Sequence, residues 1–470
     1  MAYPSPYRAG MSSLGYQWIL HRLRTRGVAA ERIFLPDDPD AWRKARAQPV
    51  TMETHAPLHA FPLIAVSLAY ELELAGLVQL LQLAGVPPLR RDRGPNDPRV
   101  LIGGPLTFSN PLPAAPFADA MLLGEADDTA PDAVEAFFDT HDRQDWLDQI
   151  AGMPGGYVPE RHGTSLPAIA TASDTVLPAY SAIRSPEAEL SDMFLIEGER
   201  GCHRQCTFCV MRRGDGLGMR RVDPATIVNH VPEGARKVGL VGAAISDHPR
   251  LVDLLQALVD RGLQVSLSSL RADRIARKPG IATQLRRSGA RTLTVASDAA
   301  SQRLRKQIAK GTSEAHLLAC AEQARQHRFD VLKIYMMVGV PDETDEDIDE
   351  LIRFSTELSR RTRVALGVAP FVAKRNTPLD GEPYAGIRVV DRRLRRLQRG
   401  LRGRVQVRPT SARWAWVEYQ LAQGGPAAGE ALYRAVSTGG RYADMRRELG
   451  AMEPCDMRPW AQEPTVDLSP

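Results

Sequence analysis

Short, continuous apolar runs alternate with amphipathic segments over the first part of the chain. The runs have the length and composition of strands that are buried on both faces of a parallel sheet. They lie at residues 63–68, 99–105 and 118–123. The segments 11–27 and 70–84 instead repeat apolar residues at helical spacing, and each ends beside a glycine. This alternation predicts a parallel α/β sheet whose ligands bind at the carboxyl ends of the strands.

A second alternation runs from Phe194 through Phe371. Six runs of strand character, separated by helical segments, lie at 194–197, 237–241, 264–268, 292–295, 331–338 and 364–368. Six β/α units are fewer than the eight that close a full barrel. Between the two alternations, residues 141–190 are rich in Pro, Gly and Ser, and this composition predicts a linker.

Composition adds a local basic feature. The length of 470 residues predicts about three domains. The net charge of +4 is unevenly spread, because residues 388–408 hold nine arginines and a single acid, Asp391. Residues 391–402 have helical period, with leucines on one stripe and arginines on the other faces. Such a face is commonly just solvated, but it also suits phosphates, so RNA is a candidate partner through residues 388–408.

Nothing in the chain predicts export or membrane insertion. Residues 1–10 contain no apolar run with a cleavage site, so we expect no secretory signal. No stretch approaches the roughly 18 uninterrupted apolar residues of a membrane span. Three of the five cysteines are clustered, which differs from a disulfide framework. We therefore expect a cytoplasmic protein without a membrane contact.

Candidate chemistry concentrates at Cys202, Cys206 and Cys209, which are spaced C-x3-C-x2-C. Thiolates this close along a chain bind an iron–sulfur cluster or zinc. Either group takes four ligands, but the other two cysteines, Cys320 and Cys455, lie far away in unrelated sequence. A four-iron cluster that is held by three cysteines has one open iron, and is therefore a reactive site rather than a passive electron carrier.

This spacing, with Phe208 directly before Cys209, resembles the signature of the radical S-adenosylmethionine (SAM) enzymes. The resemblance implies a [4Fe–4S] cluster whose open iron chelates the amino and carboxylate groups of SAM. One electron, which comes from a reducing donor such as flavodoxin or ferredoxin, then cleaves SAM to a 5′-deoxyadenosyl radical. The alternative is a zinc site that includes His203, although no second Cys or His pair follows at zinc-ribbon spacing.

The resemblance extends to several strand ends and implies which residues bind the methionine part of SAM. Gly242 lies in a small-residue turn that is only loosely similar to the family's Gly-Gly-Glu, and its backbone would approach the methionine. Ser269 and Arg271, at the end of the third strand of the barrel, are also candidates, and Arg271 would pair with the SAM carboxylate.

The nucleoside part of SAM has its own matching residues. Asp298 stands where the family carries a glutamate, and would accept the ribose hydroxyls. Gly339 belongs to a segment that resembles the family's G-x-P-x-E-T, and its backbone would lie beside the adenine. Phe208 would lie against the same base.

The first 140 residues resemble the region that precedes the barrel in a widespread group of radical SAM proteins, a region related to cobalamin-binding Rossmann domains. The matching pieces are 11–15, 67–72, 103–105 and 119–125. Cobalamin is therefore a candidate cofactor, against Gly103, Gly104 and Gly124. The D-x-H-x-x-G motif that supplies a histidine to cobalt is missing, and His55 and His59 lack its context. We expect cobalamin without a histidine ligand, or a Rossmann-like scaffold with no cofactor.

Four regions follow from these observations, in an α/β chain. They are a Rossmann-like domain of the cobalamin-binding type (1–140), the linker (141–190), a partial (β/α)6 radical SAM barrel (191–385) and a small, basic helical C-terminal region (386–470). The expected function is a radical SAM reaction on a substrate for which the sequence has no motif, with cobalamin-dependent methyl transfer as one form. Two alternatives are an RNA-modifying enzyme related to the methylthiotransferases and a non-catalytic iron–sulfur or zinc-binding protein.

Overall fold

The structure is a computed structural model that describes residues 1–213 and 218–451. It divides into two compact units. The first comprises Met1–Val176, Glu187–Glu189 and the described residues from Gln420 onward, and the second comprises Leu177–Pro186 and Leu190–Tyr419. Within the described residues, no helix combines the length and apolar character needed to cross a bilayer.

The first unit is built on a six-stranded sheet of order β2-β1-β3-β4-β5-β6. Its strands are β1 (Ala2–Tyr3), β2 (Ile33–Phe34), β3 (Leu63–Ser67), β4 (Arg99–Gly103), β5 (Ala120–Leu122) and β6 (Gly156–Tyr157). All neighbours are parallel except β5 and β6. The three apolar runs predicted as strands form β3, β4 and β5, so the predicted parallel sheet is confirmed.

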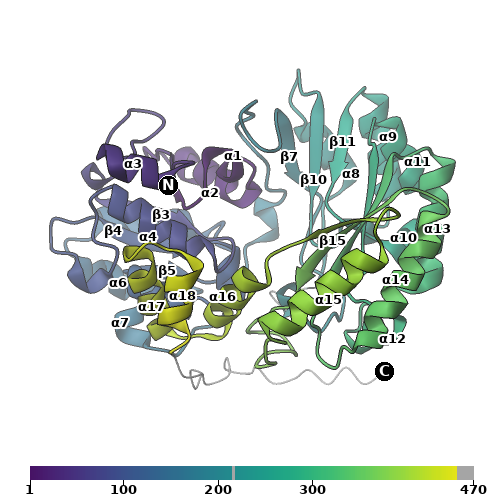
Figure 1. Ribbon diagram of the computed structural model, residues 1–470. Coiled ribbons are helices and arrows are strands. Elements are labelled where there is room, and N and C mark those ends of the chain that lie inside the picture. The colour runs from purple at the N-terminus through teal and green to yellow at the C-terminus, as the bar shows by residue number, and fades with distance from the viewer. Residues whose placement is uncertain (214–217, 452–470) are drawn as a thin grey trace, which may run out of the picture. The chain divides into compact units, whose positions relative to one another are not determined.

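Helices cover this sheet. They are α1 (Tyr7–Gly10), α2 (Leu14–Thr25), α3 (Pro39–Ala45), α4 (Glu73–Leu83), α5 (Thr129–Asp139), α6 (Arg143–Gly152), α7 (Pro159–His162), α17 (Pro426–Ser437) and α18 (Tyr442–Leu449). Apolar side chains of α2, α5 and α6 form one buried cluster with Leu101 and Leu122 of the sheet. The helix α4 is apolar nearly all round because it also packs against α17 (Figure 1).

The stretch 141–190 is more ordered than the linker we predicted. It contains α6, β6 and α7, and its residues up to Val176 belong to the first unit. The reason is a set of fully buried side chains, Trp146, Leu147, Ile150 and Tyr157. Their apolar spacing is easily missed among the prolines and glycines that surround them.

The C-terminal region, which we predicted as one helical part from 386 to 470, divides between the two units. The helices α17 and α18 belong to the first unit. Asn110, which is fully buried, donates from Nδ2 to the carbonyl oxygens of Leu421, Ala422 and Gly424 at 3.1, 3.0 and 2.7 Å. Gly429 of α17 packs so closely that a Cβ there would lie 2.0 Å from the Pro113 carbonyl oxygen.

The second unit contains two parallel sheets, of order β11-β10-β7 and β12-β13-β14-β15-β16. The strands are β7 (Met193–Glu197), β10 (Lys237–Val241), β11 (Gln264–Leu267), β12 (Leu270–Arg271), β13 (Thr292–Ala296), β14 (Val331–Val338), β15 (Val364–Pro370) and β16 (Gln406–Pro409). Only Ser268 and Ser269 separate β11 from β12, so the chain passes from one sheet to the other over two residues. The six predicted strands are all present, and β12 and β16 are two that we did not predict.

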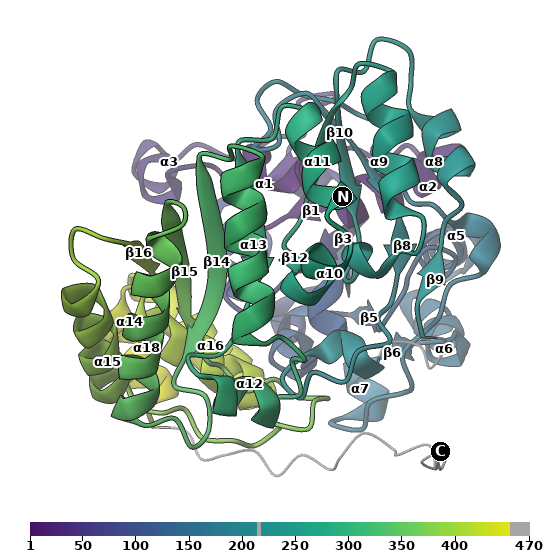
Figure 2. The ribbon, with the colours of Figure 1, turned by 90° about the vertical axis from the view of Figure 1, so that its right-hand side faces the viewer.

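Helices lie along one face of these strands, as Figures 1 and 2 show. They are α8 (Pro224–His230), α9 (Leu251–Asp260), α10 (Ala272–Arg277), α11 (Gly280–Arg287), α12 (Gln302–Gln307), α13 (Glu314–Gln326), α14 (Asp345–Ser359) and α15 (Ile387–Gly400), and α16 (Ala412–Gln423) follows β16. Thr344 caps α14, since its backbone N–H donates to Asp347 at 2.8 Å. Apolar residues of strands and helices form one continuous core.

Ion pairs fix the basic helix α15 on carboxylates that lie just before α14 and in its first two turns. Arg393 is buried and pairs with Glu343 at 3.0 Å, and Arg396 pairs with Asp349 at 2.6 Å. Within the described part of the chain, the exposed Arg395, Arg399 and Arg402 make no ion pair. The arginines of α15 therefore form two sets, one that holds the fold and one that faces solvent.

Candidate functional site

The cluster loop, residues 202–209, follows the short strand β8 (Glu199–Arg200), which pairs antiparallel with β9 (Arg220–Arg221). Gly201 has a φ of 81°, and the Gly218 carbonyl oxygen would lie 2.1 Å from a Cβ there, so only glycine fits. On the far side, the Thr207 backbone N–H donates to the Ile308 carbonyl at 3.1 Å. Both ends of the loop are thus fixed by backbone contacts.

The three cysteines of this loop are free thiols, and Cys206 is buried. Burial raises the pKa of the Cys202 and Cys209 thiols, and the other thiols of the motif raise it further. A metal centre would hold all three cysteines as thiolates. The donor set is therefore the soft, three-thiolate set that suits a [4Fe–4S] cluster.

The structure does not place His203 with the cysteines. Its Nε2 atom lies 3.8 Å from Asp247 Oδ2, and its side chain is 40% exposed. Within the described residues, no three His, Cys, Asp or Glu side chains come together around a point that could hold one metal ion. The zinc alternative with His203 as a ligand gains no support from this geometry. Cys320 lies in α13, and Cys455 lies outside the described residues.

Asp247 anchors the cluster loop. Its side chain is fully buried, and its two oxygens accept hydrogen bonds from Nε and Nη2 of Arg204, both at 2.7 Å. Arg274 donates to the same carboxylate. Burial alone would raise the pKa of Asp247, but the bonds from the two arginines outweigh it and hold the pKa at about 2. The carboxylate is therefore ionised, and through the Arg204 side chain it links the stretch between the first two cysteines to the segment that follows β10.

Arg271, our candidate partner for the SAM carboxylate, lies next to this anchor and is already partly engaged. Its Nη2 donates to the Lys310 carbonyl at 3.1 Å. Its Nε lies 3.0 Å from Asp273 Oδ1 and 4.0 Å from Asp247 Oδ1, without good hydrogen-bond geometry. The structure therefore brings Arg271 to the cluster loop, within a network of alternating charges.

Lys310 connects two further candidates. Asp298 has a φ of 63°, a conformation that turns its carboxylate out of the end of β13 and into an ion pair with Lys310. The Lys310 Nζ also lies 6.0 Å from the centre of the Phe208 ring. Lys310 is buried, at 8% exposure. Asp298, predicted to accept ribose hydroxyls, and Phe208, predicted to contact adenine, are therefore both close to one buried lysine.

Glu199 packs over Gly242. A Cβ at residue 242 would lie 2.4 Å from Glu199 Oε1, and the same oxygen accepts a hydrogen bond from the Ala244 backbone N–H at 2.5 Å. The turn after β10 is therefore made of small residues because they leave space for the Glu199 carboxyl group. Burial raises the pKa of Glu199 to about 7, and the neighbouring Glu197 and Asp247 carboxylates raise it too.

The two remaining candidates differ in their surroundings. Gly339, with a φ of 87°, is buried at the end of β14, and its N–H donates to Glu343 Oε1 at 2.8 Å. Ser269 is exposed in the link between β11 and β12. Among the described residues, the structure records no contact that joins Ser269 to the cluster loop.

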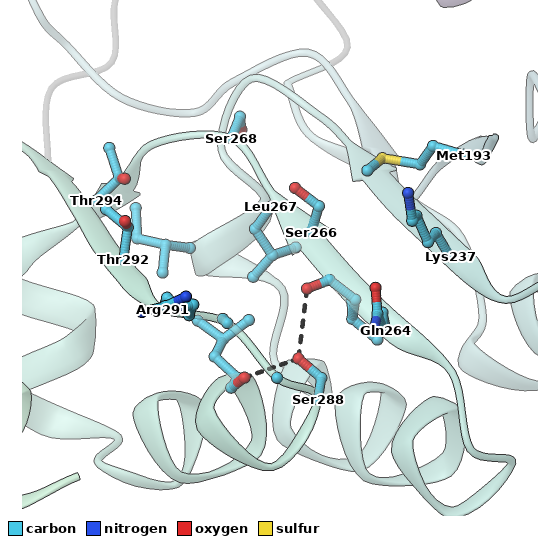
Figure 3. A pocket seen from close by; sticks show the side chains of 15 residues that line it. Met193, Lys237, Gln264, Ser266, Leu267, Ser268, Ser288, Arg291, Thr292 and Thr294 are labelled. Carbon is cyan, nitrogen blue, oxygen red and sulfur yellow. Dashed lines mark hydrogen bonds between the residues drawn. The ribbon is translucent and has the colours of Figure 1, made fainter. Parts of the chain in front are cut away.

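A cavity of about 330 Å³ lies at the other ends of these strands (Figure 3). Its lining includes Lys237, Gln264 and Thr292, the first residues of β10, β11 and β13. It exists because β11 pairs with β10 while β12, not β11, pairs with β13. The lining also includes Ser268 and Leu270, which flank the candidate Ser269, but no residue of the cluster loop.

The packing around the predicted glycines of the first unit shows whether a corrin could lie against them. Gly104 has a φ of 104°, and a Cβ there would lie 2.5 Å from the Leu68 carbonyl oxygen. Gly124 has a φ of 93°, and the Ala170 carbonyl oxygen would lie equally close to a Cβ. The chain's own backbone covers both glycines, and His55 is exposed, as is His59. At Gly103, in contrast, the nearest atom to a Cβ is the Leu122 carbonyl oxygen at 3.8 Å. The backbone contacts therefore restrict the approach of a corrin at Gly104 and Gly124, and leave Gly103 open.

Sequence reasoning missed Asp247, Lys310 and Glu199. Weak signals existed for each. Asp247 follows the small-residue turn after a strand, Lys310 directly precedes a glycine, and Glu199 stands three residues before the first cysteine. None of these signals identifies a partner, because each contact joins residues that are tens of positions apart.

Comparison with known proteins gives two family matches. Residues 15–159 match the family described as radical SAM proteins, N-terminal, and residues 196–355 match the radical SAM superfamily. An uncharacterised protein of Methanocaldococcus jannaschii is 27% identical over 397 residues, which are 81% of this chain and 79% of that protein. A Pyrococcus horikoshii protein described as an uncharacterised methyltransferase is 24% identical over 271 residues, 55% of this chain and 58% of that protein.

Among solved structures, the fold is similar to that of OxsB, a cobalamin-dependent SAM radical enzyme. The structure of OxsB with aqua-cobalamin bound matches with a TM-score of 0.51 and 14% identity, over 82% of this chain and 53% of that chain. The apo form gives the same TM-score at 12% identity, over 93% of this chain and 69% of OxsB. At this level of identity the likeness shows the fold. The chain spans about half the length of the cobalamin-bound OxsB chain.

Proposed function

This chain is a radical SAM enzyme with a radical SAM N-terminal domain, and we propose that it cleaves SAM reductively with one [4Fe–4S] cluster on Cys202, Cys206 and Cys209. The observation that carries this proposal is the cluster loop itself. Three free thiols lie on a loop that Asp247 ties, through Arg204, to the carboxyl end of a parallel strand. Ligands of α/β sheets bind at such ends.

When bound, the cluster supplies one electron to the sulfonium of SAM, whose S–C5′ bond breaks to give methionine and a 5′-deoxyadenosyl radical. The electron comes from an external reductant of the flavodoxin or ferredoxin class. The radical then takes a hydrogen atom from the substrate, which leaves 5′-deoxyadenosine and a substrate radical.

The chain's own residues position SAM in this proposal. Arg271 pairs with the SAM carboxylate, because its guanidinium lies beside the cluster loop and in a fixed orientation. Asp298 accepts the ribose hydroxyls next to its ion pair with Lys310. Phe208 and the backbone of Gly339 border the adenine. Gly242 borders the methionine, and Ser269 is the most peripheral of the candidates.

Anaerobic, reduced protein tests this function. Iron- and sulfide-loaded protein should convert SAM to equal amounts of 5′-deoxyadenosine and methionine, slowly even without substrate. The Arg271→Ala variant should weaken SAM binding while it retains its iron. Loaded, reduced protein that yields no 5′-deoxyadenosine would contradict the proposal. Near-stoichiometric zinc in place of iron would do so as well.

Cobalamin-dependent methyl transfer is the second candidate. It is favoured by the likeness to OxsB and by the methyltransferase description of the Pyrococcus horikoshii relative. The covered glycines Gly104 and Gly124 stand against a corrin at those strand ends. Titration with aquacobalamin separates the two forms. Stoichiometric binding would favour methyl transfer. The Co(II) spectrum of the bound cobalamin should then show no coupling to a histidine nitrogen, since the histidine motif is missing.

An RNA substrate is a third candidate, through the solvent-facing arginines of α15. Arg395→Ala with Arg399→Ala should weaken RNA binding and flatten its salt dependence, because each phosphate contact releases counterions. The control is Arg396→Ala, whose side chain is already paired with Asp349. Equal effects from both variants would argue against an RNA-binding face. Kinship with the methylthiotransferases is disfavoured, because two cysteines beyond the motif are too few for a second three-cysteine cluster.

A further inference from the structure

Glu199 carries a buried carboxyl group with an unused oxygen. The residue is 1% exposed, and its Oε2 atom has no hydrogen-bond partner. No ion pair of Glu199 exists within the described residues. A buried carboxyl group in this state costs free energy, so a native structure that retains one calls for an explanation.

The position of this group is set by the turn after β10. Gly242 leaves the space that the carboxyl group fills, and the Ala244 backbone N–H binds Oε1. The family's Gly-Gly-Glu, to which this turn is loosely similar, ends in a glutamate where this chain has Ala244. The chain therefore supplies a carboxylate at this strand end from the neighbouring strand, β8, instead of from the turn itself.

The charges around Glu199 leave it without a cation. Its two acidic neighbours already have partners, since Glu197 accepts from Arg200 at 2.8 Å and Asp247 accepts from Arg204 at 2.7 Å. Arg221 has only a weak electrostatic effect on Glu199. On the other side, Glu199 lies in β8, three residues before Cys202, where the cluster loop begins. Glu199 therefore lies between the first cysteine of the cluster loop and the turn where the methionine of SAM is expected.

We propose that Glu199 Oε2 accepts a hydrogen bond from the amino group of SAM, which makes Glu199 a SAM-binding residue of this chain. The inference rests on the proposed function. Two side chains then bind the two polar groups of the methionine: Arg271 binds its carboxylate, and Glu199 binds its amino group. The hydrogen bond satisfies the oxygen that the protein alone leaves unpaired.

The test is equilibrium binding to anaerobic, cluster-loaded protein. The Glu199→Gln variant keeps the shape of the side chain but removes its charge, and should weaken SAM binding about 10- to 100-fold, the range of a hydrogen bond to a charged group. Binding of 5′-methylthioadenosine, which has no amino-acid part, should be unchanged. Glu73→Gln is the matched control, because Glu73 is another buried carboxyl group, at 5% exposure, in the first unit.

Iron and sulfide content and thermal unfolding show whether each variant is folded and loaded. Glu199→Gln should not lower the stability of the metal-free protein, since no partner is lost. Unchanged SAM affinity in a loaded Glu199→Gln variant would overturn the inference and leave the proposed function intact. Equal losses for SAM and 5′-methylthioadenosine would overturn it too, because they indicate a structural role. A loaded wild-type protein that binds no SAM would instead overturn the proposed function.

Discussion

Both units present the carboxyl ends of parallel strands, but the two sets of ends differ in what covers them. In the first unit, backbone packs on backbone. The Leu68 carbonyl lies over Gly104, and the Ala170 carbonyl lies over Gly124. In the second unit, charged side chains line the ends, among them Glu199, Asp247 and the Asp298–Lys310 pair.

We interpret this difference as close packing in the first unit and a candidate site in the second. The rule that ligands bind at the carboxyl ends of parallel strands predicts a location, and both sheets satisfy it. The chemistry of the residues at those ends decides whether anything binds. Glycines with positive φ under a carbonyl oxygen complete the packing of the first unit. In the second unit, an unpaired carboxyl oxygen and a three-thiol loop are available to a ligand.

The largest expected effect is the loss of the cluster. Replacing Cys202, Cys206 or Cys209 by alanine should reduce bound iron from about four per chain to near zero and abolish SAM cleavage. The control is Cys320→Ala, because Cys320 is buried in α13 and its thiol donates to the Ala272 carbonyl. Iron and sulfide analysis after anaerobic reconstitution gives the answer. If Cys320→Ala also lost iron, the three-ligand description would be wrong.

The packed ends of the first unit should be sensitive to a single methyl group. Gly124→Ala should lower the free energy of unfolding of that unit by about 2 to 4 kcal/mol, through its positive φ and the clash with Ala170. Gly27→Ala has a similar φ of 84° but no atom within 4 Å, and should cost about 1 kcal/mol. Denaturant unfolding measures both. Equal costs would show that Gly124 is not closely covered and would reopen this edge for a corrin.

The anchor of the cluster loop should matter less for folding than for retention of iron. Asp247→Asn removes the charge that binds Arg204 and Arg274. The change should lower the free energy of unfolding by about 2 to 3 kcal/mol. This is at the low end for a buried ion pair, because the side chains of these arginines are 24–25% exposed. The variant should also lose iron faster to a chelator. Asp253→Asn, whose side chain is 69% exposed on α9, should change neither quantity. An unchanged rate of iron loss would remove Asp247 from the site.

The smallest effect is a pH dependence. The folded-state pKa of Glu199, about 7, lies above its ordinary value of 4.5, so the folded protein binds this proton more tightly than the unfolded chain. The free energy of unfolding of metal-free protein should therefore fall as pH rises from about 4.5 to 7, by on the order of 2 kcal/mol. Glu199→Gln should remove this component. Identical pH profiles for the two proteins would show that the carboxyl group is solvated or paired.

The sequence predicted the fold well where burial is periodic. The apolar runs that became β4 and β10 are readable because three consecutive residues of each strand are buried. Those that became β3 and β14 are readable because buried residues alternate along them. The strand β16 escaped because Gln406–Pro409 is mostly exposed and polar at the edge of its sheet, where even a proline is tolerated. The attachment of α17 to the first unit also escaped, because an amphipathic helix does not specify the surface that it covers.

The candidate site divides in the same way. Cys202, Cys206 and Cys209 could be predicted because their spacing is local. Asp247, Lys310 and Glu199 could not, because each acts through contacts with distant segments. Glu199 is the clearest case. It is notable because its Oε2 atom has no hydrogen-bond partner, and a sequence cannot show which side chains remain unpaired after folding.

The central claim is that the strand ends of the second unit hold both the cluster and SAM. Pulsed electron paramagnetic resonance on the reduced, cluster-loaded protein tests it directly, with SAM labelled by ¹⁵N at the amino group and by ¹⁷O at the carboxylate. The account predicts hyperfine coupling of both labels to the cluster, with the ¹⁵N complex weakened in Glu199→Gln. A reduced cluster that shows no coupling to either label at saturating SAM would contradict it.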